Sequence, residues 1–342
     1  NVQPVLMLYR RGSSGHWSGR SIELPKNMAA SIVSSDPHSS EAYLQLEGFI
    51  QPPQIWSVNT AKQNTQLLYS QPELFDSSKL TVEQLFAPSK DGTQVPYFVV
   101  HAKDWTKNGA NPTLMTAYGG FGLSYLPVYH PDLGITWFER GGVYVMANIR
   151  GGGEFGPAWH EAARHAGRQS AYDDFASVAR DLFSRNITSA KRLGIRGRSN
   201  GGLLMGVEFT QHPELWNATI IGVPLLDMLN YEHMAAGASW AAEYGSVSTP
   251  EGKAFWDKTP PLQALKPDVH YPTPFIFTST RDDRVGPVHA RLFAARLQEL
   301  HVPFFYYEDM EGGHAGTVNA AEVAHERALE AVDLSRRLMD PR

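Results

Sequence analysis

The sequence predicts an α/β fold in which a mostly parallel sheet is covered by helices on both faces and preceded by a smaller antiparallel β region. From about residue 80 onward, short apolar runs alternate with segments of helical periodicity, which is typical of parallel strands joined by helices. Before that point, apolar stretches recur about every ten residues between clusters of turn-forming residues, which indicates antiparallel strands. We therefore expect a β segment over residues 1–75 and an α/β domain over residues 76–342.

The composition is that of an ordinary globular protein. The 342 residues include 30 basic and 35 acidic side chains, for a net charge of −5, and 42% are hydrophobic. This balance argues against a nucleic-acid partner, and the lack of an apolar run of about 18 residues argues against a membrane span. With no cysteine, the chain has no thiolate nucleophile and no disulfide. We expect a monomer or weak oligomer, cytoplasmic or periplasmic, whose targeting region lies outside this chain.

The first 75 residues are predicted to form six short strands. Six strands are too few for a closed β-propeller, which needs at least four blades of about four strands, so we expect one or two blades of a larger β-propeller. The predicted strands cover residues 5–9, 21–24, 29–33, 42–46, 55–58 and 66–69. Polar and proline residues over 71–78 mark the expected boundary with the next domain.

In the α/β region, strands and helices are predicted from the length and periodicity of the apolar segments. The short buried runs that suit strands are 113–117, 143–147, 193–195, 218–223, 275–278 and 304–307. The helical segments are 171–183, 203–211, 288–300 and 320–339. Loops that follow these strands are the expected places for functional side chains.

One motif stands between a predicted strand and a predicted helix. Gly197-Arg198-Ser199-Asn200-Gly201 fits the Gly-x-Ser-x-Gly nucleophile elbow of α/β-hydrolases. The turn is so sharp that side chains at either glycine would collide with neighbouring backbone. The helix that follows directs its first N–H groups toward negative charge that develops beside Ser199.

Partners for Ser199 follow later strands in the order that this fold requires, acid and then histidine. Asp282 and Asp283 come after the predicted strand 275–278, and His314 comes after the strand 304–307. The histidine would accept the serine proton, and a carboxylate would hold its ring in the needed tautomer. The pattern alone leaves Asp282 and Asp283 as alternatives.

From about residue 85 onward, the sequence resembles the catalytic domain of the prolyl oligopeptidase family of serine peptidases. The resemblance extends over several motifs and includes Asn and two glycines directly after Ser199. The matching segments are Pro88-Ser89-Lys90-Asp91-Gly92-Thr93, Tyr118-Gly119-Gly120-Phe121, residues 147–154 (ANIRGGGE), Asp282-Asp283-Arg284-Val285 and Gly313-His314. Arg198 stands where the family commonly has glycine, and we expect its side chain to point away from the substrate.

The resemblance implies hydrolysis of short proline-containing peptides on the carboxyl side of proline through an acyl-enzyme, with no cofactor and no metal. It implies Ser199 as nucleophile, His314 as base and acid, and Asp282 as the orienting carboxylate. It also implies that the Tyr118 hydroxyl and the Asn200 backbone N–H hold the oxyanion. The implied substrate-binding residues are Trp240, which stacks on the proline ring, Phe121, Tyr244, Val285 and Leu225 around it, and Arg284, which donates to a substrate carbonyl.

Other functions fit parts of the sequence less well. A related branch, such as oligopeptidase B or acylaminoacyl peptidase, would prefer another residue before the cleaved bond. Gly151-Gly152-Gly153-Glu154-Phe155-Gly156 matches a dinucleotide-binding pattern with acids at 173 and 174, but no second strand precedes those acids. His160 and His165 miss the His-Glu-x-x-His zinc spacing by one position. An interaction protein with an inactive hydrolase domain is disfavoured by the intact set of serine, acid and histidine.

Overall fold

The computed structural model describes residues 2–317 and 319–340 and divides into two compact units. One unit comprises Asn1–Gln84, Val100–Asp104 and Leu126–Arg140, and the other comprises Leu85–Val99, Trp105–Tyr125 and Gly141–Arg342. A domain boundary between residues 75 and 76 stays a prediction. Within the described part of the chain, none of the helices has the length and apolar character needed to cross a membrane.

The first unit contains six antiparallel strands, and each of the six predicted strands overlaps one of them. A two-stranded sheet pairs β1 with β2, and a four-stranded sheet has the order β3-β4-β5-β6. Alternating apolar side chains of these strands, among them Met28, Leu44 and Leu46, form a small buried cluster. The strands are β1 (Leu6–Arg11), β2 (Trp17–Ile22), β3 (Met28–Ser35), β4 (Glu41–Gly48), β5 (Gln54–Asn59) and β6 (Asn64–Ser70).

A short helical segment of the same unit packs on Phe75. The segment consists of α1 (Pro131–Leu133) and a π-helical turn over Gly134–Phe138. The Phe75 ring stacks on Tyr129 with 5.0 Å between ring centroids. A Cβ atom at Gly134 would lie 2.0 Å from that ring, so the close approach requires glycine there.

An eight-stranded sheet has the order β14-β13-β12-β11-β9-β10-β8-β7, and its strands β9 to β14 lie in the second unit. The strands from β9 to β14 pair in parallel, which confirms the predicted α/β class. The strands are β7 (Leu80–Pro88), β8 (Gln94–Ala102), β9 (Thr113–Thr116), β10 (Val143–Ala147), β11 (Leu193–Arg198), β12 (Ala218–Gly222), β13 (Pro274–Ser279) and β14 (Phe305–Asp309). The sequence analysis did not predict β7 and β8.

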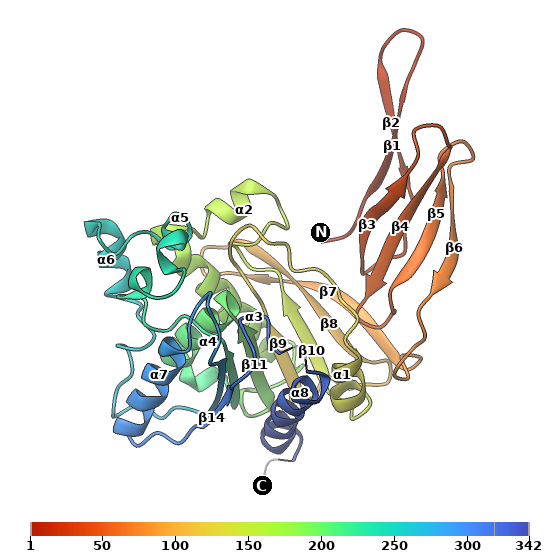
Figure 1. Cartoon of the computed structure of the whole chain (residues 1–342). Helices are drawn as coiled ribbons and strands as arrows, with labels where there is room; N and C mark the ends of the chain where they lie inside the picture. The colour runs from red at the N-terminus through yellow and green to blue at the C-terminus, as the bar shows by residue number, and fades with distance from the viewer. Residues whose placement is uncertain (1, 318, 341–342) are drawn as a thin grey trace. The chain divides into compact units, whose positions relative to one another are not determined.

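Helices cover both faces of this sheet, and β11 lies between two of them (Figure 1). A Cβ atom at Gly194 would approach Leu334 of α8, whereas one at Gly197 would approach Met205 of α4. Because side chains alternate along a strand, these contacts place α8 and α4 on opposite faces. The α-helices are α2 (Pro157–Glu161), α3 (Gln169–Ser184), α4 (Asn200–Gln211), α5 (Ala241–Tyr244), α6 (Pro250–Trp256), α7 (Val288–Glu299) and α8 (Ala320–Leu334).

Shorter helical turns lie between these elements. The last predicted helix, 320–339, is α-helical only to Leu334 and then continues as a π-helix over Ser335–Met339. The 3-10 helices are His165–Arg168, Ala190–Arg192, Pro213–Leu215, Tyr231–His233 and Gly237–Trp240.

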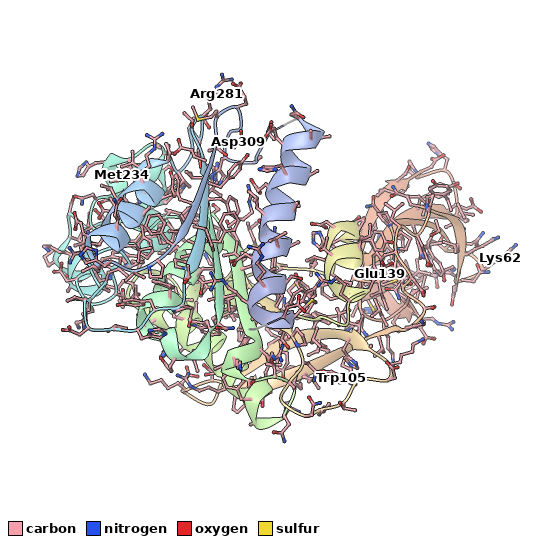
Figure 2. All side chains as sticks on the ribbon, turned by 90° about the horizontal axis from the view of Figure 1, so that it is seen from below. Lys62, Trp105, Glu139, Met234, Arg281 and Asp309 are labelled. Atoms are coloured by element: carbon pink, nitrogen blue, oxygen red, sulfur yellow. The ribbon has the colours of Figure 1, made fainter. Side chains whose placement is uncertain are left out.

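Parallel strands direct their carboxyl ends to one edge of the sheet, where loops can gather functional side chains. Arg281 follows β13 and Asp309 ends β14, and both lie at this edge (Figure 2). The Thr280 N–H donates to the Asp309 carbonyl at 2.8 Å, which ties the two loops together. The loops after β9 and β11 meet the same edge.

Candidate active site

Ser199 occupies a strained turn between β11 and α4. Its φ of 58° and ψ of −121° lie in a region that residues with a side chain rarely adopt. The close approach of the flanking backbone requires glycines, since a Cβ atom at Gly197 would lie 2.3 Å from the Gly201 carbonyl oxygen. The Ser199 N–H donates to the Gly222 carbonyl at 3.0 Å and so fixes the turn on the neighbouring strand. This geometry is that of the predicted nucleophile elbow.

The structure brings Ser199, His314 and Asp282 into one hydrogen-bonded series. His314 Nε2 lies 2.9 Å from Ser199 Oγ, and its Nδ1 lies 2.8 Å from Asp282 Oδ2. An ionised carboxylate accepts the Nδ1 proton, which leaves Nε2 as an acceptor for the serine hydroxyl proton. The neighbouring Asp283 is exposed, so of the two alternatives it is Asp282 that faces the histidine.

Asp282 is held by more than the histidine. Its Oδ1 atom accepts backbone N–H bonds from Arg284 at 3.0 Å and Val285 at 2.9 Å. Burial raises the pKa of Asp282, but the His314 and backbone hydrogen bonds outweigh it, so the pKa lies below its ordinary value. The carboxylate is therefore ionised at neutral pH and orients the imidazole.

His314 lies at the tip of a short turn after β14. Gly313 and Gly316 exchange two backbone hydrogen bonds of 3.2 and 3.1 Å across this turn. The Asp309 carboxylate accepts the N–H groups of Glu311 and Gly312, which fixes the start of the loop. The histidine ring thus depends on backbone bonding in a loop, not on a helix or strand.

Two groups that could stabilise an oxyanion lie beside Ser199. Tyr118 follows β9 and lines the same cavity as Ser199. Burial raises the pKa of Tyr118 above its ordinary value, so the hydroxyl stays protonated and remains a donor. Asn200 is the first residue of α4, a position whose backbone N–H has no acceptor within the helix.

Three of the predicted substrate-binding residues form an aromatic cluster. The Tyr244 ring contacts Phe121 edge-on at 5.6 Å and Trp240 edge-on at 6.5 Å between centroids. Leu225 and Val285 are buried in the same large apolar core as Trp240 and Tyr244. Val285 is tied to the site through its bond to Asp282.

The two arginines next to catalytic motifs are in different environments. Arg284 is exposed, and its positive charge opposes the rise in the pKa of Tyr118. Within the described residues it forms no ion pair with Asp283 or Glu308, and Glu308 pairs with Arg291 instead. Arg198 forms an ion pair with Glu326 and lies over the Phe277 ring at 4.8 Å. Its charge is thus directed toward α8, although the residue also lines the cavity next to Ser199.

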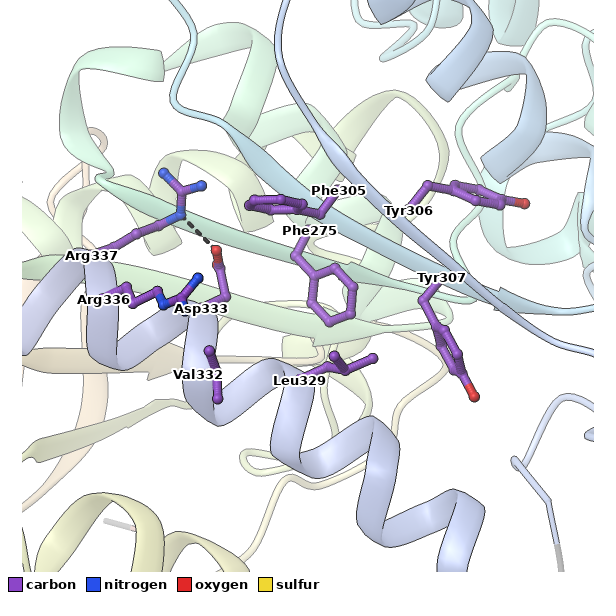
Figure 3. A pocket seen from close by; sticks show the side chains of 9 residues that line it. All are labelled: Phe275, Phe305, Tyr306, Tyr307, Leu329, Val332, Asp333, Arg336 and Arg337. Atoms are coloured by element: carbon purple, nitrogen blue, oxygen red, sulfur yellow. Dashed lines mark hydrogen bonds and ion pairs between the residues drawn. The ribbon is translucent and has the colours of Figure 1, made fainter.

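Ser199 and His314 line a cavity of about 290 Å³, together with Tyr118 and Tyr125. A larger cavity of about 480 Å³ lies between β13, β14 and α8 (Figure 3). Phe275, Phe305 and Val332 give that second cavity an apolar wall, and none of the serine, histidine and acid residues lines it. The smaller cavity is the candidate active site, because it is lined by Ser199 and His314 of the hydrogen-bonded series. Within the described residues, no group of three potential ligands is arranged to hold a metal ion.

Sequence analysis missed a polar group beside Phe121 and Tyr244, made of the half-buried His160 and the buried Arg168 and Glu243. His160 is 2.7 Å and Arg168 is 3.3 Å from the Glu243 carboxylate. Glu243 is 75 residues beyond Arg168 in the sequence, and no motif joins it to His160 and Arg168. The nearest signal was the family resemblance of residues 147–154, which lie shortly before His160. The Gly151 carbonyl of that segment accepts the Gly122 N–H at 3.0 Å.

The parallel sheet with a serine at a sharp turn after a central strand defines an α/β-hydrolase. A model of the prolyl oligopeptidase family matches residues 129–332. The chain therefore belongs to the prolyl oligopeptidase family, which is a family of serine peptidases. This membership excludes the dinucleotide-binding alternative.

Similar proteins extend over nearly the whole chain. An uncharacterized peptidase of Sinorhizobium fredii is 49% identical over 340 residues, 99% of this chain and 47% of that protein. A prolyl endopeptidase of Elizabethkingia meningoseptica is 33% identical over 314 residues, 90% of this chain and 44% of that protein. A solved post-proline cleaving enzyme from Rickettsia typhi has a TM-score of 0.90 and 36% identity, with 99% of this chain and 49% of that chain covered. The chain spans about half the length of the curated relatives it matches.

Proposed function

We propose that this chain is the catalytic part of a serine peptidase that hydrolyses short peptides on the carboxyl side of proline. The observation that carries the proposal is the hydrogen-bonded series of Ser199, His314 and Asp282, with distances of 2.9 and 2.8 Å, beside the aromatic cluster. Its similarity to prolyl endopeptidases supports the same specificity.

In the first step, His314 Nε2 takes the Ser199 hydroxyl proton while the serine oxygen attacks the substrate carbonyl carbon. Negative charge moves to the carbonyl oxygen, where the Tyr118 hydroxyl and the Asn200 N–H donate to it. When the C–N bond breaks, the imidazolium gives its proton to the departing amine. An ester between Ser199 and the proline carbonyl remains.

The second step repeats this chemistry with water. His314 takes a proton from the water molecule, whose oxygen attacks the ester carbon, and the same two donors hold the oxyanion. Collapse returns the proton to Ser199 and releases a peptide that ends in proline. Asp282 stays ionised throughout and stabilises the imidazolium in both steps.

The aromatic cluster supplies the proposed selectivity. A proline ring that stacks on Trp240, between Phe121 and Tyr244, loses contact with water, which is worth about 2 kcal/mol for a buried aliphatic side chain of this size. Arg284, which is exposed next to Asp282, donates to a carbonyl of the bound peptide.

Cleavage after basic residues, as in oligopeptidase B, is the second candidate. A pocket for a basic side chain needs a free carboxylate. Glu243 adjoins Tyr244 in α5, but its carboxylate already accepts from the Phe121 N–H and pairs with His160 and Arg168. This occupied carboxylate favours an apolar ring in the pocket over a cation.

The test is release of a chromophore from blocked Gly-Pro, Gly-Arg and Gly-Phe substrates by the 342-residue chain. We expect cleavage of the Gly-Pro substrate and none by the Ser199→Ala variant. Preferential cleavage of the Gly-Arg substrate would overturn the proposed specificity. Labelling of Ser199 by a fluorophosphonate, with no cleavage of any of the three, would mean a reactive serine without the proposed peptide site.

Replacing Trp240 by alanine should reduce selectivity more than reactivity. We expect the Trp240→Ala variant to lose about 30-fold in kcat/KM on the Gly-Pro substrate, the equivalent of about 2 kcal/mol, and much less on a small acetate ester. Trp216→Ala is the matched control, because Trp216 is buried in the same core without contacting the cluster. It should lower both activities equally, through stability alone. Equal losses in Trp240→Ala would contradict the assignment of the pocket.

A further inference from the structure

A buried carboxylate connects the two sides of the proposed substrate pocket. Glu243 is 4% exposed and lies in α5 next to Tyr244. One of its oxygens accepts the Phe121 backbone N–H at 2.8 Å, and the other lies 2.7 Å from His160 Nε2. The residue therefore joins the helix that carries one aromatic wall to the loop that carries the other.

Arg168 balances this carboxylate and extends the network toward the serine. Its guanidinium is 1% exposed, lies 3.3 Å from Glu243 and donates to the Asn200 side-chain oxygen. It also lies over the Tyr244 ring, 4.7 Å from the centroid. Burial lowers the pKa of Arg168, but the nearby tyrosines and Glu243 raise it above its ordinary value, so the arginine stays charged.

The Asn200 side chain closes the network on the loop from Tyr118 to Phe121. Its Nδ2 donates to the Tyr118 carbonyl at 2.5 Å, while its Oδ1 accepts the Tyr244 hydroxyl at 3.0 Å. A Cβ atom at Gly120 would lie 2.6 Å from that Nδ2, so the amide packs directly on the loop. The loop has no regular secondary structure, and Phe121 has a φ of 57°. Its position thus depends on side-chain contacts.

We propose that Glu243 is a positioning residue that sets the distance between Phe121 and Tyr244 and thereby the selectivity of the pocket for a proline ring. The proposal rests on the proposed function. Without the carboxylate, the Phe121 N–H loses its acceptor and the buried Arg168 loses its counter-charge, and an unpaired buried charge is strongly unfavourable. The loop and α5 then separate, although the serine, histidine and acid keep their own bonds.

Glu243→Gln is the informative variant, because glutamine keeps the size of the side chain. In Glu243, Phe121 and Arg168 donate to one carboxylate oxygen and His160 faces the other. Glutamine keeps only one of the two acceptor oxygens, places an NH₂ group against either His160 or the Phe121 and Arg168 donors, and removes the negative charge that balances Arg168. The measurement is the second-order rate of Ser199 labelling by two probes, a diphenyl phosphonate that carries a pyrrolidine ring and a small alkyl fluorophosphonate. Both rates report on the serine, and only their ratio reports on the pocket. Neither needs turnover of a peptide.

The ratio is the labelling rate of the pyrrolidine phosphonate divided by that of the alkyl fluorophosphonate. We expect Glu243→Gln to lower this ratio at least tenfold. Asp333→Asn is the matched control. It removes a buried carboxylate of α8 that pairs with Arg337 at 2.8 Å and does not line the active-site cavity, so it should leave the ratio unchanged. The Glu243→Gln/Arg168→Gln double variant should lower the ratio no further than the worse single variant, because both act through one contact.

Equal slowing of both probes in Glu243→Gln, or an unchanged ratio, would overturn the positioning role. Thermal unfolding of each variant separates lost protein from altered selectivity, since a smaller folded fraction lowers both rates equally. Failure of the proposed function appears in the wild-type chain instead, as a pyrrolidine phosphonate that reacts no faster than one carrying a basic or phenyl side chain.

Discussion

The Asp282→Asn variant is expected to hydrolyse prolyl substrates about 10³–10⁴-fold more slowly than the wild-type chain, with little change in KM. Both oxygens of Asp282 are engaged, one by His314 and one by two backbone N–H groups. The asparagine oxygen would keep the two backbone bonds, so its NH₂ group would face His314 Nδ1. That arrangement places the imidazole proton on Nε2, where it can no longer accept the serine proton.

Asp283→Asn is the control for this prediction, since it makes the same chemical change at the exposed neighbouring position. We expect it to keep kcat within about twofold of wild type, because an exposed carboxylate contributes little through water. Steady-state kinetics on the Gly-Pro substrate at neutral pH measures both variants. A large loss in Asp283→Asn with normal rates in Asp282→Asn would exchange the roles of the two residues.

The parts of the fold that the sequence predicts well are those in which local periodicity and burial agree. The strand at 143–147 and the helix that begins at Val288 are found where the apolar pattern places them, since each buries a continuous apolar face. β7 and β8 were missed although Gln94–Ala102 contains a long apolar run, because no helix follows either strand. The segment 320–339 was predicted as one continuous helix, whereas its last turn is π-helical, because apolar periodicity does not distinguish a π-helical turn from an α-helical one.

At the site, the sequence predicts residues whose role depends on their position in a motif. Ser199 and His314 follow strands in a fixed order, and the structure brings them to 2.9 Å. The Glu243 network has no such signal, because its contacts join segments more than 70 residues apart, such as Arg168 and Glu243. Which of Asp282 and Asp283 faces the histidine is likewise a matter of loop geometry, which sequence order leaves open.

The Tyr118→Phe variant is expected to lose about 10²–10³-fold in kcat, as on removal of one oxyanion donor, while KM changes less than about threefold. Phenylalanine keeps the ring, which lines the cavity beside Ser199, and deletes only the hydroxyl. Ser199 retains its bond to His314, so the nucleophile stays oriented. The loss therefore falls on the transition state, in which the carbonyl oxygen becomes charged and needs a second donor besides the Asn200 N–H.

Tyr307→Phe is the matched control, because it also removes one tyrosine hydroxyl, at 3.2 Å from Glu322 and outside the active-site cavity. It should leave kcat unchanged. A Tyr118→Phe variant with normal kcat and a raised KM would show that the hydroxyl binds the ground state of the substrate, and Asn200 would then be the main oxyanion donor. A fall in kcat alone separates these roles, since an interaction made only in the transition state lowers kcat and kcat/KM equally.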